Sequence, residues 1–117
     1  MTGKIIWWDL RTPDVEAARN FYGTLLGWTF EDFEFGLVVK HEGESVGMIS
    51  AVDPGQASAA GTVLYAHVED LGSAVATVND LGGRVIAGPI EDNDGGLFVD
   101  ILDPTGVRVG LWSRLPR

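Results

Sequence analysis

Apolar and polar positions change their spacing several times along the first half of the chain, and each spacing predicts an element. Apolar residues alternate with their neighbours over residues 4–11, which predicts a half-buried strand. A helical spacing follows, with Thr12 as the predicted N-cap and Gly27 as the stop. Three short β-rich runs between residues 28 and 52 then predict antiparallel strands, so this half has the order β-α-β-β-β.

The second half repeats this order after a segment of small residues at 54–61, which predicts a linker. Its predicted elements are a strand at 62–69, a helix at 71–81 and strands at 84–90, 96–102 and 107–113. Asp103-Pro104-Thr105-Gly106 predicts a tight turn before the last strand. We therefore expect an α+β protein with a single domain, 1–117, in which two βαβββ modules, about 4–53 and 62–114, are joined by the linker.

Short matches between the two halves support a duplication. The run Val46-Gly47-Met48-Ile49-Ser50 aligns with Val109-Gly110-Leu111-Trp112-Ser113. Asp14, at the start of the first helix, aligns with Asp70 at the start of the second. This alignment makes Gly47 the expected counterpart of Gly110.

Charge and composition narrow the classes of partner. The 117 residues include 17 acidic and 8 basic side chains, a formal net charge of −9, and no cysteine. The negative charge disfavours nucleic acid and anionic lipid, and it favours neutral or cationic partners. No apolar run reaches the roughly 20 residues of a membrane-spanning helix, and the start carries no secretion-signal pattern. We therefore expect a cytoplasmic protein without disulfides.

Six short motifs mark the ends and turns of the predicted elements. They are Asp14-Val15-Glu16-Ala17-Ala18-Arg19-Asn20-Phe21-Tyr22, Leu25-Leu26-Gly27-Trp28, Val68-Glu69-Asp70, Leu81-Gly82-Gly83, Gly88-Pro89 and Asp103-Pro104-Thr105-Gly106. Together they resemble the vicinal oxygen chelate superfamily, which includes glyoxalase I, the extradiol dioxygenases and the bleomycin-resistance proteins. The resemblance implies that the modules form curled mixed sheets, closed into a cup, with the helices outside. It implies little about activity, because these motifs serve the fold.

In the enzymes of this superfamily, a divalent metal ion is held by one side chain from the first strand and one from the last strand of each module. The resemblance puts these four positions at Trp7, Val63 (or its neighbour Leu64), Gly47 and Gly110. None of these residues offers the N or O donor that such an ion needs. We therefore expect no metal and no other cofactor, and a character closest to metal-free bleomycin-resistance-type proteins. A relocated metal site is the alternative, with Asp9, His67 and Asp100 as donors.

If those four positions face the cup, strand alternation turns further side chains inward. The residues expected to line or cover a ligand-binding cleft are Trp7, Asp9, Trp28, Phe33, Phe35, Ile49, Tyr65, His67 and Trp112. Gly47 and Gly110 would widen the cleft, because a missing side chain lets a ligand approach the backbone. The alternative is that these aromatic residues fill the core or a subunit interface, as we expect for Trp8, Phe21 and Tyr22 in the core.

Two functions are consistent with these expectations. The first is non-catalytic binding and sequestration of an aromatic or cationic antibiotic or metabolite by a homodimer, a form of drug self-resistance. The second is a metal-free or atypically liganded enzyme, an isomerase, lyase or cyclase, in which Asp9 or His67 acts as the general base. Whether each cup forms within one chain or across a dimer stays open.

Overall fold

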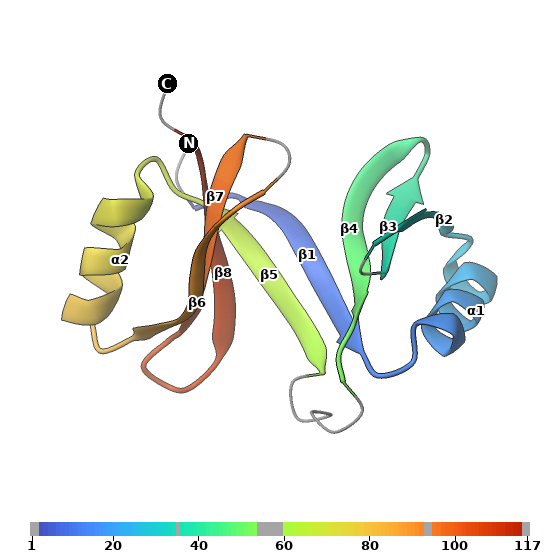
Figure 1. Ribbon diagram of the computed structural model, residues 1–117, viewed down its shortest axis with the longest axis horizontal. Helices are drawn as coiled ribbons and strands as arrows, with labels where there is room; N and C mark the ends of the chain where they lie inside the picture. Colours follow the sequence, from blue (N-terminus) through green and yellow to red (C-terminus); the bar gives the residue numbers. More distant parts are fainter. Residues whose placement is uncertain (1–2, 35, 54–59, 93–94, 116–117) are drawn as a thin grey trace. The chain divides into compact units, whose positions relative to one another are not determined.

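The computed structural model describes residues 3–34, 36–53, 60–92 and 95–115, so Phe35 and most of the expected linker lie outside the described residues. The chain divides into two compact units (Figure 1). The N-terminal unit is Trp7–Val63, and the C-terminal unit joins Leu64–Arg117 to the segment before Trp7.

The N-terminal unit contains most of β1 (Ile5–Thr12), then α1 (Val15–Leu26), β2 (Thr29–Phe33), β3 (Gly36–His41) and β4 (Glu44–Ala51). Its strands lie in the order β2-β3-β4-β1, with β1 and β4 parallel and the other pairs antiparallel. The helix α1 covers one face of this sheet (Figure 1). The predicted βαβββ order is confirmed.

The start of α1 differs from its prediction by two residues. Thr12 is the last residue of β1 and its hydroxyl accepts the Asp14 N–H at 3.1 Å, so Thr12 is not the N-cap. Asp14 is the cap, because its Oδ1 accepts the Ala17 N–H at 3.0 Å. The predicted stop at Gly27 is confirmed, since this residue adopts φ 70°, a left-handed conformation that favours glycine.

The core of this unit lies between α1 and the sheet. Its buried residues are Ala18, Leu37, Val39 and Ile49, with Trp8, Leu10, Val15, Tyr22, Trp28, Phe30 and Val46 packed against them. The core assignment of Trp8 and Tyr22 is therefore confirmed. That of Phe21 is wrong: the residue is 59% exposed, because Ala18 and Tyr22 take the face of α1 that meets the sheet.

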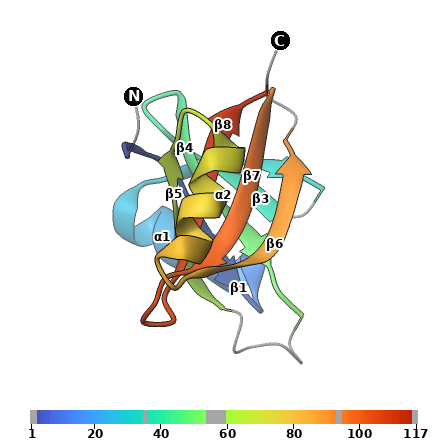
Figure 2. The same cartoon turned by 90° about the vertical axis from the view of Figure 1, so that its left-hand side faces the viewer.

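The C-terminal unit contains most of β5 (Gly61–His67), then α2 (Leu71–Asp80), β6 (Arg84–Glu91), β7 (Gly96–Leu102) and β8 (Arg108–Arg114). Its strands lie in the order β5-β8-β7-β6, with β5 and β8 parallel. Figure 2 shows α2 lying across one face of this sheet. The buried core between helix and sheet consists of Leu71 from α2 and of Val99 and Ile101 from β7.

Two local features of this unit follow from single residues. Asp70 caps α2 by accepting the Ser73 N–H at 3.2 Å, as Asp14 does for α1. The predicted turn at Asp103 is confirmed, since its Oδ1 accepts hydrogen bonds from the Thr105 hydroxyl and from the N–H groups of Thr105 and Val107. Neither helix of the described residues is long and apolar enough to cross a membrane.

Candidate ligand-binding site

Three predicted site residues, Tyr65, His67 and Trp112, belong to the C-terminal unit and lie on the face of its sheet turned away from α2. Val99, Ile101 and Leu111 pack toward the helix, so strand alternation turns Phe98, Asp100, Gly110 and Trp112 to the other side. Tyr65 and His67 share that side, since they pair with Gly110 and Trp112 across β5 and β8. We call this surface the α2-distal face: Tyr65, His67, Phe98, Asp100, Gly110 and Trp112.

A buried carboxylate organises the middle of the α2-distal face. Asp100 is 2% exposed; its Oδ1 accepts the Tyr65 hydroxyl at 2.9 Å, and its Oδ2 accepts both Nε (3.2 Å) and Nη2 of Arg108. A buried carboxylate is stable only when its oxygens are paired in this way. The ring of Phe98 stands edge-on to that of Tyr65, with centroids 5.8 Å apart. These contacts fix Tyr65 in one orientation.

The glycines do not leave empty space in the sheet. A methyl group at Gly110 would overlap the ring of Tyr65, one at Gly96 would overlap the indole of Trp112, and one at Gly47 would overlap the indole of Trp8. The expectation that Gly47 and Gly110 widen a cleft is therefore wrong. Each glycine instead lets an aromatic ring approach the backbone closely, and the ring fills the space that a side chain would occupy.

Trp112 and His67 form the aromatic end of the α2-distal face. Their ring centroids are 5.8 Å apart and their planes are tilted by 41°. The indole N–H of Trp112 donates to Oδ2 of Asp92, at the end of β6. Trp112 is half-buried, so part of its ring surface is accessible.

In the N-terminal unit, the first strand carries a second carboxylate. Asp9 is buried; its Oδ1 accepts the indole N–H of Trp7 at 3.1 Å, and Arg11 donates to its Oδ2 at 3.4 Å. Asp9 pairs with Met48 across β4, while the next pair, Leu10 with Ile49, packs toward α1. Asp9 and its partners therefore lie on the face turned away from α1.

Two residues predicted to line or cover the cleft instead lie in or against the core under α1. Ile49 is fully buried in the core under α1. Trp28 packs against that core, with its ring 5.3 Å from Trp8 and 5.4 Å from Tyr22. The expectation that Ile49 lines the cleft and that Trp28 covers it is therefore wrong. For Ile49, one residue of register in β4 decides this outcome, because it moves a side chain to the opposite face of a sheet.

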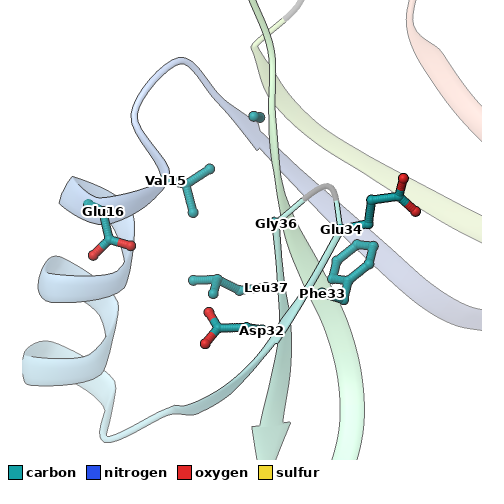
Figure 3. A pocket seen from close by; sticks show the side chains of 8 residues that line it. Val15, Glu16, Asp32, Phe33, Glu34, Gly36 and Leu37 are labelled. Atoms are coloured by element: carbon teal, nitrogen blue, oxygen red, sulfur yellow. The ribbon is translucent and has the colours of Figure 1, made fainter.

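Phe33 lies elsewhere in the N-terminal unit, on an open hollow of about 390 Å³ between the start of α1 and the β2–β3 hairpin. Figure 3 shows Val15 and Leu37 on its apolar side and Glu16, Asp32 and Glu34 around it. Two of these acids, Glu16 and Asp32, are paired with Arg19, at 3.5 and 2.7 Å. Phe35, the other aromatic residue predicted near Phe33, lies outside the described residues.

The strand register corrects the alignment of the two modules. Asp9 and Tyr65 each lie five residues before a helix N-cap; Asp9 pairs with Met48, whereas Tyr65 pairs with Gly110. Met48, not Gly47, is therefore the counterpart of Gly110. A β-bulge between Val39 and Lys40 shifts the register beside β4, which comparison of short identical runs does not detect.

The corrected positions do not fit a divalent metal ion. They carry an indole at Trp7, an isopropyl group at Val63, a thioether at Met48 and no side chain at Gly110. Hard or borderline dications require imidazole nitrogen or oxygen ligands, which none of these residues supplies. Across the described ranges, no three His, Asp or Glu side chains gather where they could hold a metal ion. Asp9 and His67 belong to different units.

Comparisons with known proteins show the family to which the chain belongs. The chain belongs to the glyoxalase/bleomycin resistance protein/dioxygenase superfamily, whose profile matches residues 4–111. It is 34% identical over 115 residues to "Putative glyoxylase CFP32" of Mycobacterium bovis and to the protein of the same name in Mycobacterium tuberculosis. The match covers 92% of this chain and 44% of each relative, so the chain spans less than half their length.

Solved structures show the same fold at low sequence identity. Methylmalonyl-CoA epimerase of Streptomyces coelicolor, in complex with 2-nitronate-propionyl-CoA, has a TM-score of 0.67 at 16% identity, covering 97% of this chain and 96% of that one. The epimerase of Mycobacterium tuberculosis has a TM-score of 0.63 at 18% identity, covering 97% and 89%. Homoprotocatechuate 2,3-dioxygenase of B. fuscum has a TM-score of 0.70 at 17% identity, covering 98% of this chain and 33% of that one.

Sequence reasoning missed three residues that organise the α2-distal face. The sequence predicts no partner for Arg108, and no pattern in it points to Asp92 or Gly96 as part of the site. Asp100 was considered only as a donor in a relocated metal site. One signal was available, because a carboxylate inside the apolar run Gly96–Leu102 requires a buried partner.

Proposed function

We propose that this domain binds an aromatic or cationic organic molecule against its aromatic sheet faces and does not alter it. The observation that carries the proposal is the composition of the four positions at which metal-dependent members of the superfamily hold their ion. They carry Trp7, Val63, Met48 and Gly110, which suit contact with hydrocarbon rather than coordination. In this respect the chain is similar to metal-free bleomycin-resistance-type proteins.

The α2-distal face has the groups that such a ligand needs. Trp112 lies over Gly96 and is half-buried, and stacking of a flat ligand on its accessible surface contributes about 0.5–1.5 kcal/mol beyond the area it buries. A ligand cation over an indole gains roughly 0.5–2 kcal/mol. The formal net charge of −9 raises the local concentration of cations.

Binding of this kind acts by stoichiometry. Each site removes one molecule from solution when the dissociation constant lies well below the ligand concentration. No bond is formed or broken, and drug self-resistance by sequestration is the biological role we propose. We also propose that the protein is a cytoplasmic homodimer. Native mass spectrometry measures the mass of the assembly directly.

A second candidate function is a metal-free enzyme. The 34% identical mycobacterial relatives are named as a glyoxylase, which favours catalysis. Asp9 and His67 are the candidate general bases in this case, and a base must lie within about 3 Å of the proton it removes. Both oxygens of Asp9 already accept hydrogen bonds from Trp7 and Arg11, so a substrate proton would have to displace one of these donors.

One experiment separates the two functions. Protein dialysed against a chelator is titrated by calorimetry with a panel of aromatic cations and neutral aromatics, proflavine among them, and each compound is recovered and weighed by mass spectrometry. The proposal expects saturable binding of at least one compound, recovered unaltered, with an affinity that added Mn²⁺ or Zn²⁺ leaves unchanged. Failure of the whole panel to bind overturns it, as does chemical turnover or a stoichiometric metal that survives dialysis.

A further inference from the structure

The indole of Trp112 is held on its edge and on one face by a small set of contacts. Its N–H donates to Oδ2 of Asp92. The other oxygen of the same carboxylate, Oδ1, accepts the backbone N–H of Gly96 at 2.8 Å. Gly96 in turn lies under the ring, where any side chain would overlap Nε1, Cε2 and Cζ2 of the indole. One carboxylate thus fixes both the ring and the backbone beneath it.

The remaining surroundings of Trp112 favour stacking. His67 lies at a ring-centroid distance of 5.8 Å, and the guanidinium carbon of Arg114 lies 5.9 Å from the indole centroid. The side chain of Arg114 is exposed, so it can be displaced at little cost. A ring whose edge and lower face are already fixed loses little side-chain freedom when a ligand stacks on it.

We propose that Trp112 is the stacking platform for a planar, conjugated ligand, and that Asp92 and Gly96 are its positioning residues. This inference rests on the proposed function and narrows it to one ligand geometry and one end of the α2-distal face. The contact area of a flat ring falls steeply when its partner is not flat, so the platform selects planar molecules over globular ones of equal charge. Asp92 and Gly96 act through Trp112 and need not touch the ligand.

The test uses two cationic probes, planar proflavine and non-planar tetraphenylphosphonium, with quenching of tryptophan fluorescence as the signal. Wild-type protein is expected to bind proflavine at least tenfold more tightly than tetraphenylphosphonium. Trp112→Leu removes the platform and should weaken proflavine binding about tenfold. Asp92→Asn keeps the size of the side chain but replaces one acceptor oxygen by a donor, so it should weaken binding by about threefold or more.

Gly96→Ala distinguishes positioning from direct contact. The added methyl group must push the indole out of its plane, so binding should weaken while the near-ultraviolet circular dichroism of tryptophan changes. Trp28→Phe, in the core of the other unit, is the matched control and should leave proflavine affinity within twofold, with folding checked by far-ultraviolet circular dichroism. Wild-type binding that survives Trp112→Leu, Asp92→Asn and Gly96→Ala overturns this inference and leaves the proposed function standing. Absence of wild-type binding to the whole panel described above overturns the proposed function itself.

Discussion

Replacement of Gly110 by alanine tests the packing of the α2-distal face at its best-defined point. The new methyl group would overlap Cγ, Cδ1 and Cε1 of Tyr65, a residue that is only 5% exposed. Overpacking of this kind costs about 1–3 kcal/mol. Displacing the ring also breaks its 2.9 Å hydrogen bond to buried Asp100, which costs about another 1–3 kcal/mol. We therefore expect Gly110→Ala to lower the free energy of unfolding by about 2–6 kcal/mol.

Equilibrium urea unfolding, followed by tryptophan fluorescence and far-ultraviolet circular dichroism, measures this loss. The matched control is Gly72→Ala on α2, where the nearest atom to the new methyl group is Oδ1 of Asp70 at 3.3 Å. It should change stability by less than about 1 kcal/mol, in either direction. In a Tyr65→Leu background the penalty of Gly110→Ala should shrink, because the ring that it displaces is gone.

A Gly110→Ala protein within about 0.5 kcal/mol of wild type, with an unchanged denaturant slope, would refute the reasoning. So would a penalty of the same size in the presence and absence of the Tyr65 ring. Either result would mean that the ring does not lie over this glycine. The Tyr65 ring would then not cover the backbone of β8 at this position.

Three further predictions concern charged side chains. Arg108→Met leaves buried Asp100 with one fewer partner and should lower the free energy of unfolding, measured with urea, by about 1–3 kcal/mol. This loss is smaller than for a fully buried ion pair, because Arg108 is partly exposed. The double variant with Asp100→Leu should lose less than the sum of the two single losses. Asp14→Ala removes the N-cap of α1 and should lower thermal stability by about 1 kcal/mol. The hydroxyl of Thr105 and the N–H groups of its turn lower the pKa of Asp103, so its stabilising contribution is present above the unfolded value and is lost as pH falls through the lower folded pKa. Asp103→Asn should remove that part of the acid dependence, measured as the melting temperature between pH 5 and 2.

Most elements of the fold could be predicted because their signals are local. The helix expected at 71–81 is observed at Leu71–Asp80, and the strand expected at 96–102 has those limits in the structure. Apolar spacing, acidic N-caps and helix-ending glycines act within a few residues, so a sequence displays them directly. The error at the start of α1 arose because Thr12 and Asp14 are both good capping residues, and only the end of β1 decides between them.

The faces of the strands were harder to predict, because a face is set by pairing between distant residues. The match of Gly47 with Gly110 rested on identical neighbours, whereas the pairing of β4 with β1 makes Met48 the counterpart. The same error of one residue turned Ile49 toward the expected cleft instead of the core. Sequence alone gives no register for parallel strands separated by a helix and two further strands.

The structure brings three of the predicted site residues to one face of a sheet, while their role in binding stays a prediction. Tyr65, His67 and Trp112 lie on one face, since a single strand pair, β5 with β8, places all three. The role of Asp92 was not predictable, because it depends on an acceptor at the end of β6 meeting an indole from β8. The function of the glycines was misjudged, since an absent side chain looks the same in a sequence whether a ligand or a neighbouring ring fills the space.

A nuclear magnetic resonance titration of ¹⁵N-labelled protein tests most directly whether the α2-distal face binds flat organic molecules and not metal ions. The indole N–H signals of the four tryptophans are assigned by substitution and followed during addition of proflavine, and separately of Mn²⁺. We expect proflavine to shift the Trp112 signal with saturation and Mn²⁺ to broaden no signal selectively. Saturable proflavine binding that leaves Trp112 unmoved, or selective broadening by Mn²⁺ at Trp112 or Trp7, would contradict this expectation.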